Sequence, residues 1–469
     1  MPTHRRPVTS RRVAPDPTGG KRALVLCGGG ITGLTYEIGA LRALDDLLVG
    51  SSVNDFDIFV GTSAGSMVGA LLANGITPTE MALGLEGSNE RLSPPTRWTI
   101  YRPNLGEAAS RWLKLPWVAQ QILSELVRHP GRLNPIDVLG MLSPLLPSGF
   151  FSSGELVRFL ERLLTSEGCS DDFRKLGPEL HIVACALDSG QRVVFNRFNE
   201  RAEVPISAAA AASSAVPVLF RPVRLDGVDY VDGGIKGISA IDVAVDRGAT
   251  LIVAINPIVP VDTRHLSVPT GAREVIGEHL TDMGMRGVYN QVFRGMLHDG
   301  LLDHIRLVRH NHPDVDIVLI EPRPDDEKMF FHEVMSFSAQ MIVLEHGYET
   351  VIGGLYQMWP YLRRILPKHG IEITRKVIES KPLEVSVEEL EKQGNLLGRL
   401  FQTVLDRRTA VGERPEVTSL VDAQPARKAR PKAKPRSATA RKTAAAGDAS
   451  GAGKVRQRGT FRPRIVDAD

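Results

Sequence analysis

The hydrophobic pattern that begins near residue 23 contains one unit twice: a short apolar run, a glycine-rich turn and an amphipathic segment. Residues 23–27 (ALVLC) are apolar and lead into three glycines. From Leu34 to Leu48 apolar residues recur every three or four positions, and the segment stops at Gly50. This spacing predicts a buried strand, a turn and a helix that ends at a glycine. Residues 56–60 (FDIFV), 61–65 (GTSAG) and 66–73 (SMVGALLA) predict the same succession again.

Further strand patterns follow in the second half of the chain. Apolar runs at 181–187, 192–198, 250–256 and 316–322 predict strands, and Asp226-Gly227 between two extended runs predicts a β-hairpin. Strands that alternate with helices predict a mainly parallel sheet covered on both faces, which is a three-layer α/β/α fold. We expect the main domain to span residues 23–260 and residues 261–410 to be a mostly helical extension with one further strand.

Residues 78–150 have a different pattern, with helical pieces separated by prolines. They contain three of the four tryptophans, Trp98, Trp112 and Trp117. We interpret this stretch as a helical insertion or cap. Within it, residues 107–129 combine apolar and basic positions, and two interpretations stay open: a helix that lies at a lipid interface, or a cap that packs on the core.

Charge divides the chain into three parts. Residues 1–22 carry six Lys/Arg and one Asp (+5), and residues 421–469 carry thirteen and four (+9), so the total of +3 leaves residues 23–420 at −11. The Ala-, Lys-, Arg- and Pro-rich tail cannot bury enough apolar surface to offset its chain entropy. We predict disorder for residues 1–22 and 411–469. A solubilising role, contact with anionic membrane lipids and, ranked lower, contact with nucleic acid stay open for these basic arms.

The remaining composition excludes several protein classes. Three cysteines exclude a disulfide scaffold and form no zinc motif, and His310-x-His312 is too short a pattern for a metal site. We therefore predict no metal and no cofactor. Apolar runs are far shorter than a membrane-spanning helix needs, and the basic start has no apolar stretch. We expect a cytoplasmic protein, with peripheral membrane contact as an extension of that prediction.

The strongest chemical pattern surrounds Ser63, which is the centre of G-x-S-x-G between a predicted strand and a predicted helix. This arrangement is typical of a nucleophile elbow, in which a strained backbone lifts the serine hydroxyl clear of the sheet. Gly61 and Gly65 flank it because side chains there would collide across the turn. The positive end of the following helix would favour developing negative charge. A packing turn with an inert serine is the alternative.

A second glycine loop, residues 28–33 (GGGITG), also follows a strand and opens a helix. Its G-x-G-x-x-G form is compatible with dinucleotide binding, but Asp55 and Asp57 lie on the strand that leads into the serine turn, the wrong place for a ribose ligand. Backbone N–H groups in such a loop can instead bind an oxyanion. We favour this second interpretation and assign the candidate oxyanion hole to the backbone of Gly28, Gly29, Gly30, Ile31 and Gly33.

The candidate base is Asp232, in the sequence Asp232-Gly233-Gly234 at the end of the predicted hairpin. The two glycines would let backbone and substrate approach. Proton transfer from a hydroxyl to a carboxylate with an ordinary pKa is uphill by roughly 12 kcal/mol, so Asp232 must be shielded from water to act. A turn or capping role is the alternative. We assign Asp226 to the hairpin turn and expect the side chain of Asp229 to face solvent.

Together, GGGITG, GTSAG and DGG, in this order, resemble the patatin-like phospholipase family over roughly residues 23–260. The segment ASSAVPVLFRPV is similar to the stretch that precedes the catalytic aspartate in that family. The resemblance implies a patatin-like fold and a Ser–Asp dyad without histidine, with Ser63 as nucleophile and Asp232 as base. It also implies hydrolysis of fatty-acyl esters without calcium, and oxyanion donors at Gly29, Gly30 and Ile31.

One position departs from the family pattern. Many members carry Arg or Lys where this chain has Thr32. The departure leaves the backbone donors in place but removes a cation that could steer a phosphate headgroup. The leading hypothesis is therefore a lipid acyl hydrolase that forms an acyl-Ser63 intermediate. The alternatives are an acyltransferase that uses the same dyad, a catalytically silent protein that binds membrane or nucleic acid through its basic arms, and a nucleotide-binding protein.

Overall fold

The computed structural model of this chain describes residues 16–89, 91–129, 134–237, 239–263, 279–326, 329, 335 and 337–375. These residues belong to one compact unit within residues 1–414. Most of the predicted N-terminal arm and the whole of the predicted tail at 411–469 lie outside the described residues. Within the described ranges, no helix has both the length and the apolarity that crossing a membrane requires.

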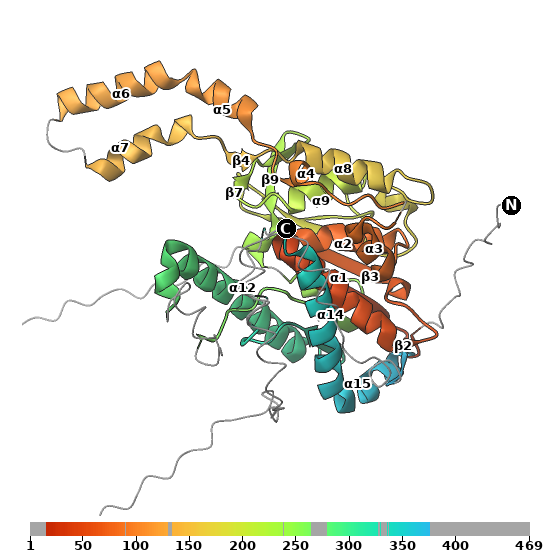
Figure 1. The fold of residues 1–469 in the computed structure, drawn as a ribbon. Helices are drawn as coiled ribbons and strands as arrows, with labels where there is room; N and C mark the ends of the chain where they lie inside the picture. Colours follow the sequence, from red (N-terminus) through yellow and green to blue (C-terminus); the bar gives the residue numbers. More distant parts are fainter. Residues whose placement is uncertain are drawn as a thin grey trace, which may run out of the picture. The chain divides into compact units, whose positions relative to one another are not determined.

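The central sheet is mixed and mainly parallel (Figure 1), as the alternation of strands and helices predicted. The first five strands in its spatial order are parallel to one another, and the last two form a hairpin that is antiparallel to the fifth through its second strand. The order is β11 (Asp316–Ile320), β10 (Ala249–Ile255), β1 (Lys21–Leu26), β3 (Ile58–Thr62), β5 (Glu179–Ala186), β9 (Val228–Asp232) and β8 (Val223–Leu225), with β6 (Arg192–Phe195) paired to β5.

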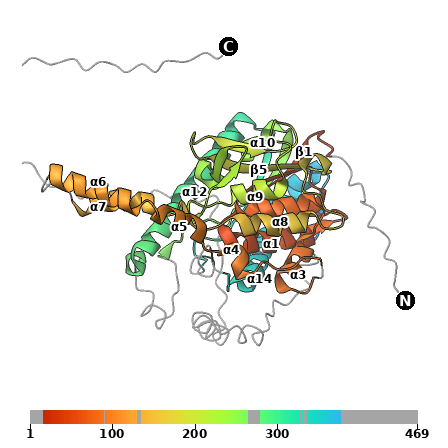
Figure 2. The ribbon, with the colours of Figure 1, turned by 90° about the horizontal axis from the view of Figure 1, so that it is seen from above.

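Helices cover both faces of this sheet. Side chains alternate between the two faces along each strand, so a strand that is apolar throughout contributes to an apolar cluster on each face. On β1, Leu24 and Leu26 belong to one apolar cluster and Ala23 and Val25 to the other. Figure 2 shows α10 on one side of the strands and α1, α8 and α14 on the other. The first cluster includes residues of α1 (Gly30–Leu47), α2 (Ala64–Ala73), α3 (Pro78–Glu86), α8 (Gly154–Leu164), α9 (Ile206–Ser213) and α14 (Gln340–Gln357), and the second includes residues of α10 (Ile241–Asp246) and α12 (Gly284–Asn311).

Residues beyond 260 share the core of the main domain. Strand β11 extends the sheet beside β10, and α14 packs along α1. The two helices approach closely at glycines: a Cβ atom on Gly39 would lie 2.3 Å from the carbonyl oxygen of Leu344, and one on Gly347 would lie 3.1 Å from the ring of Tyr36. Helix α15 (Trp359–Ile365) and the short pair β2 (Leu48–Val49) and β12 (Glu372–Ile373) complete this side.

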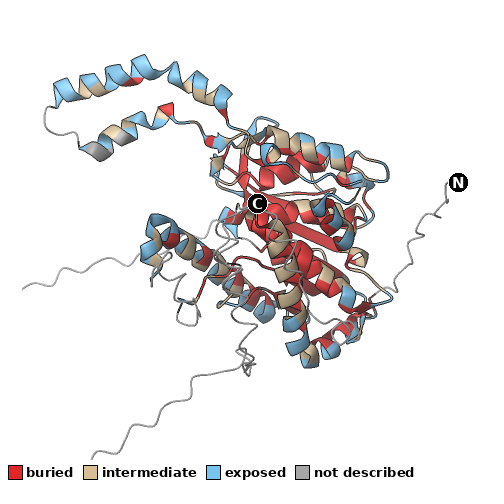
Figure 3. Cartoon of the chain, in the orientation of Figure 1, coloured by how far each residue is buried: buried red, intermediate tan, exposed pale blue. Residues whose placement is uncertain are grey.

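The insertion between α3 and α8 is helical, as predicted, but its middle is open to solvent. It contains α4 (Arg97–Ile100), α5 (Leu105–Trp112), α6 (Leu115–Arg128) and α7 (Pro135–Leu142), and ends at β4 (Gly149–Phe151), which pairs with β7 (Val218–Phe220). In α5 and α6 the only buried residue is Val118, and Figure 3 shows both helices largely in the colours of exposed residues. The buried-cap interpretation of residues 107–129 is therefore wrong for these two helices.

Candidate active site

The register of β5 brings the serine turn and the aspartate motif together. Val183 pairs with Thr62 of β3, and the next residue, Ala184, pairs with Asp232 of β9. Strand β6 pairs with residues 182–185 of β5 and so occupies its other edge. Strand β9 must therefore lie on the same edge as β3 and continue beyond its end. The carboxyl ends of β3 and β9 thus meet beside β5, and Asp232 is placed next to the turn that holds Ser63.

Ser63 has the strained backbone that a nucleophile elbow requires. Its φ is 53° and its ψ is −131°, a region that non-glycine residues rarely adopt. Its N–H donates a 2.8 Å hydrogen bond to Oγ of Ser213, whose hydroxyl donates in turn to the carbonyl oxygen of Val183 at 2.6 Å. Through these two hydrogen bonds, Ser213 on α9 links the strained turn at Ser63 to β5.

The glycines around Ser63 allow close backbone contacts. A Cβ atom on Gly61 would lie 2.5 Å from the carbonyl oxygen of Gly65, and one on Gly65 would lie 2.4 Å from the carbonyl oxygen of Leu26. The first is the collision across the turn that the pentapeptide pattern led us to expect, whereas the second is a collision with β1. Gly28, at φ 80°, also requires glycine, because a Cβ there would lie 2.8 Å from the Cβ of Ser63. The two glycine loops therefore pack directly on each other.

Asp232 is buried, with 6% of its surface exposed, and Ser63 is exposed by only 7%. Burial raises the pKa of Asp232 to about 6, against the lowering effect of hydrogen bonds from the Ser63 side chain and from the backbone N–H of Gly234. The Gly234 N–H lies 2.8 Å from Oδ1. A Cβ on Gly233 would lie 2.3 Å from the carbonyl oxygen of Val183, which explains the first glycine of the motif.

The glycine loop at 28–33 contains both engaged and available amides. Gly28 N–H donates a 2.8 Å hydrogen bond to Oε1 of Glu37, and Gly33 N–H donates to the carbonyl oxygen of Gly29 at 3.0 Å. These two amides are already paired, so we no longer count Gly28 and Gly33 among the candidate oxyanion donors. Gly30 and Ile31 stand in the first turn of α1, where N–H groups have no acceptor within the helix.

Glu37 and Ser213 are the two site residues that the sequence analysis missed. Glu37 is buried inside α1, and burial raises the pKa of its carboxyl group well above the ordinary value. The available signal was a lone acid among the apolar positions of the predicted helix. Ser213 lies in a run of alanines and serines, and only the fold shows which of these serines meets Ser63.

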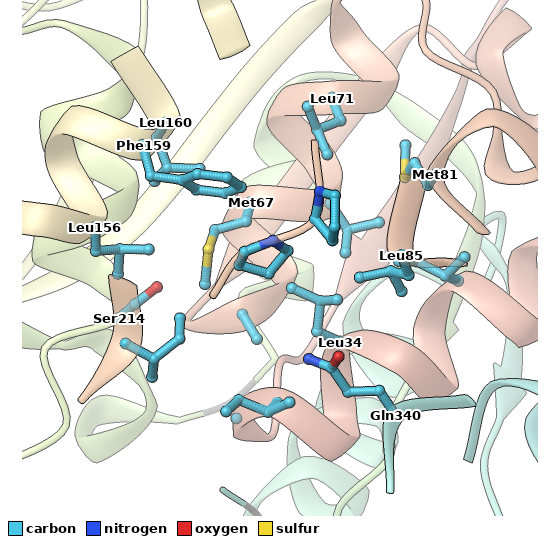
Figure 4. A pocket seen from close by; sticks show the side chains of 18 of the residues that line it. Leu34, Met67, Leu71, Met81, Leu85, Leu156, Phe159, Leu160, Ser214 and Gln340 are labelled. Carbon is cyan, nitrogen blue, oxygen red and sulfur yellow. The ribbon is translucent and has the colours of Figure 1, made fainter. Parts of the chain in front are cut away.

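An apolar pocket opens at Ser63 and the start of α1 (Figure 4), with about 990 Å³ of empty space when the solvent at its mouth is included. Its lining residues on α1 run from Gly30 to Ile38, and those at the serine turn and on α2 run from Ser63 to Leu71, so the ends of each run are eight residues apart. At 1.5 Å per residue this gives two apolar walls about 12 Å long. Other walls come from α3 and α8, including Met81, Leu85, Leu156, Phe159 and Leu160.

The other candidate residues lie away from this pocket. No histidine among the described residues lines it; His298, for example, pairs with Glu321 at 3.0 Å. Asp229 pairs with Arg224, and Asp226 occupies the hairpin turn at φ 49°. Asp57 bonds the amide of Arg22 near the amino end of β1, whereas the glycine loop follows its carboxyl end. This arrangement does not fit a dinucleotide site. Thr32 is buried.

Comparison with known proteins agrees with the resemblance seen in the motifs. The sequence model of the patatin-like phospholipase family matches residues 24–245. A curated relative, the probable lipid hydrolase 463L of Invertebrate iridescent virus 6, is 25% identical over 230 residues. That match covers 48% of this chain and 63% of the relative, so the chain spans less than two thirds of the relative's length.

Two bacterial structures show more distant similarity. VipD from Legionella pneumophila is 16% identical, with 74% of this chain and 70% of that chain covered and a TM-score of 0.31. The type III effector protein ExoU is also 16% identical, with 84% and 63% covered and a TM-score of 0.29. The match to the family model spans both glycine motifs and the aspartate motif. Residues 24–245 therefore form a domain of the patatin-like phospholipase family.

Proposed function

We propose that this protein is a lipid acyl hydrolase in which Ser63 is the nucleophile and Asp232 is the base. The observation that carries the proposal is the buried Asp232 carboxylate, with a pKa near 6, hydrogen-bonded to Ser63 beside an apolar pocket. Compared with its ordinary value, this pKa narrows the gap to a serine hydroxyl by about two units, or about 3 kcal/mol of proton-transfer free energy. Burial thus makes Asp232 a stronger base, which favours proton transfer from the serine hydroxyl.

In the first step, Ser63 Oγ attacks the carbonyl carbon of an acyl ester and its proton passes to Asp232. The resulting oxyanion accepts hydrogen bonds from the amides of Gly29, Gly30 and Ile31; one such donor typically contributes about 3–4 kcal/mol. When the tetrahedral intermediate collapses, the C–O bond to the alcohol breaks and Asp232 returns the proton to the alcohol oxygen. The product of this step is acyl-Ser63.

In the second step, water attacks the acyl-Ser63 carbonyl carbon while Asp232 takes a proton from it. Collapse of this intermediate breaks the bond to Oγ and Asp232 returns the proton to Ser63. The fatty acid leaves. One aspartate therefore serves as base and acid in both halves of the reaction.

The pocket supports a fatty-acyl group as the substrate's acid portion. Its walls are almost entirely apolar side chains, which is typical of sites that bind apolar ligands. An extended chain advances about 1.2 Å per bond, so walls of about 12 Å accommodate an acyl chain of about ten bonds. The curated relative's designation as a probable lipid hydrolase agrees with this substrate class.

The test is fatty-acid release from phospholipid vesicles and from p-nitrophenyl esters by three purified variants. Ser63→Ala and Asp232→Asn should each lose activity by at least about a thousandfold with unchanged circular dichroism. Asp229→Asn, a carboxylate on the same hairpin that faces Arg224, is the matched control and should retain full activity. Normal activity in Ser63→Ala would end the proposal, as would failure of a fluorophosphonate probe to label wild-type Ser63.

The near-complete burial of Ser63 and Asp232 favours one second candidate, acyl transfer to an alcohol. Deacylation depends on which nucleophile reaches a site with little exposed surface, and an acceptor that binds the pocket mouth would compete with water. Incubation of the acyl-enzyme with added glycerol distinguishes the two reactions. Glycerol esters as the main product would indicate a transferase, and free fatty acid would indicate a hydrolase.

A further inference from the structure

Helix α12 carries an exposed apolar stripe that the pocket and the core leave uncovered. Six residues spaced by one, three or four positions form one face of its N-terminal half: Met285, Val288, Tyr289, Val292, Phe293 and Met296. Met285 is 88% exposed and Met296 is 70% exposed. The opposite face of the helix carries its buried residues, including Gly287, Leu301 and Ile305. This helix therefore has one apolar face in the core and a second one in solvent.

The inner face of α12 is fixed to the neighbourhood of the glycine loop. Gln291 forms two hydrogen bonds with the backbone of Val261, at 2.7 and 3.0 Å, and the buried Arg294 donates to the carbonyl oxygen of Val259. In the same segment, Ile258 packs against Gly29. The exposed stripe thus belongs to a helix anchored beside the candidate oxyanion hole.

Helices α5 and α6 and the residues between them carry a second group of exposed apolar side chains. This group includes two tryptophans and several leucines: Trp112, Leu113, Leu115, Trp117, Leu123 and Leu126. The insertion that carries them leaves the pocket wall after Ile100 and returns to it at Leu156, both of which line the pocket. The insertion is therefore joined to the border of the pocket, and α12 is joined to the segment that packs on Gly29.

We propose that the exposed faces of α12 and of α5–α6 dock this protein on a lipid bilayer that contains anionic headgroups. The proposal rests on the proposed function, because a lipid acyl group must leave a bilayer to reach Ser63. No carboxylate lies between Met285 and Met296 of α12. The carboxylates of α5 and α6 are Glu107, which pairs with Arg111, and Glu125, which lies 3.8 Å from His129. The exposed cations Arg286, Lys114 and Arg128 lie among the exposed apolar residues. Apolar faces with tryptophan and basic residues at their edges are typical of helices that lie in the membrane interface.

The test is vesicle flotation of the full-length protein carrying Ser63→Ala, so that the vesicles stay intact. Vesicles of phosphatidylcholine with phosphatidylglycerol are compared with phosphatidylcholine alone, at physiological and at high salt. Four further substitutions, Trp112→Gln, Trp117→Gln, Met285→Gln and Met296→Gln, remove exposed apolar surface with a residue that favours helices. The matched control carries Leu83→Gln and Leu187→Gln, which are exposed elsewhere on the molecule.

We expect the fourfold variant to bind mixed vesicles at least about tenfold more weakly, and the control to bind like its parent. Binding by the parent should persist in part at high salt, because apolar insertion is not screened. Equal flotation of the fourfold variant and the control would overturn the proposal. So would a self-association of the parent, seen by sedimentation, that the four substitutions abolish without any change in flotation.

A second measurement separates this proposal from the proposed function. With Ser63 intact, the fourfold variant should hydrolyse a soluble p-nitrophenyl ester normally and lose activity only on vesicles. If Ser63 proved not to be catalytic, flotation would still give its own answer, since it requires no turnover.

Discussion

The backbone N–H of Gly28, two residues before α1, donates a 2.8 Å hydrogen bond to the carboxyl group of Glu37 within α1. Gly28 is the residue that packs on Ser63, and Glu37 has no exposed surface. Because burial holds the pKa of Glu37 well above its ordinary value, this acid is favoured in its neutral form. A buried acid, favoured in its neutral form, therefore holds the glycine loop against the turn that contains Ser63.

Two substitutions of Glu37 should show whether the glycine loop depends on a hydrogen-bond acceptor at this position. Glu37→Gln keeps an acceptor for Gly28, so hydrolysis should stay within about threefold of wild type. Glu37→Ala leaves the buried Gly28 N–H without its acceptor, which typically costs about 1–3 kcal/mol, and should reduce kcat by about tenfold or more. Urea unfolding and ester hydrolysis measure both effects. Equal kcat values for the two variants would contradict a positioning role.

The pKa of Asp232 sets an expected pH dependence of catalysis. A base with a pKa near 6 must lose its proton to act, so kcat/KM should fall below about pH 6 and level off above it. The measurement is a pH profile with a soluble p-nitrophenyl ester, with stability checked at each pH. A midpoint near 4, the ordinary value for aspartate, would contradict a raised pKa for the catalytic base.

The same pKa predicts that Asp232 weakens the fold. A carboxyl group whose folded pKa is raised binds its proton more tightly in the folded chain, so the free energy of unfolding falls as pH rises from about 4 through about 6. Asp232→Asn should remove this loss and stabilise the protein at pH 7 by up to about 3 kcal/mol while abolishing hydrolysis. Urea titrations at pH 4 and pH 7 test it. A variant less stable than wild type at both pH values would refute the prediction.

The length of the pocket predicts a preference among acyl chains. Leu71 lies two turns of α2 beyond Ser63, on the wall of the pocket. Leu71→Phe should shorten the space and lower kcat/KM for long-chain p-nitrophenyl esters by at least about tenfold, since each methylene left unburied costs about 0.8 kcal/mol. The butyrate ester should be hydrolysed at the wild-type rate. A uniform loss on both esters would indicate general damage instead.

The elements that local chemistry determines were predictable from the sequence. Asp226 and Gly227 both have positive φ and form the two-residue hairpin turn that their identities predicted. The strand–turn–helix units at Ser63 and at Gly28 were predictable in the same way, from the spacing of apolar residues and the positions of glycines. The α/β fold with a mainly parallel sheet is confirmed, while the catalytic roles of Ser63 and Asp232 stay predictions.

Features that depend on distant parts of the chain were not predictable. The amphipathic pattern of α5 and α6 states which face is apolar but not what covers it, and the structure leaves that face exposed. The contact of α14 with α1 depends on a match between Gly39 and Gly347 that no local pattern reveals. The bond from Ser63 to Ser213 joins residues 150 positions apart and exists only once α9 is packed.

The head-to-head meeting of β3 and β9 along β5 has a consequence for synthesis of the chain. Ser63 emerges from the ribosome long before β9, so a nascent chain exposes its serine turn without the acid that would activate it. On the proposed mechanism, lipolytic chemistry is withheld until the last hairpin has joined the sheet. The order of synthesis would thus delay hydrolysis until residues 228–232 have been made and have folded.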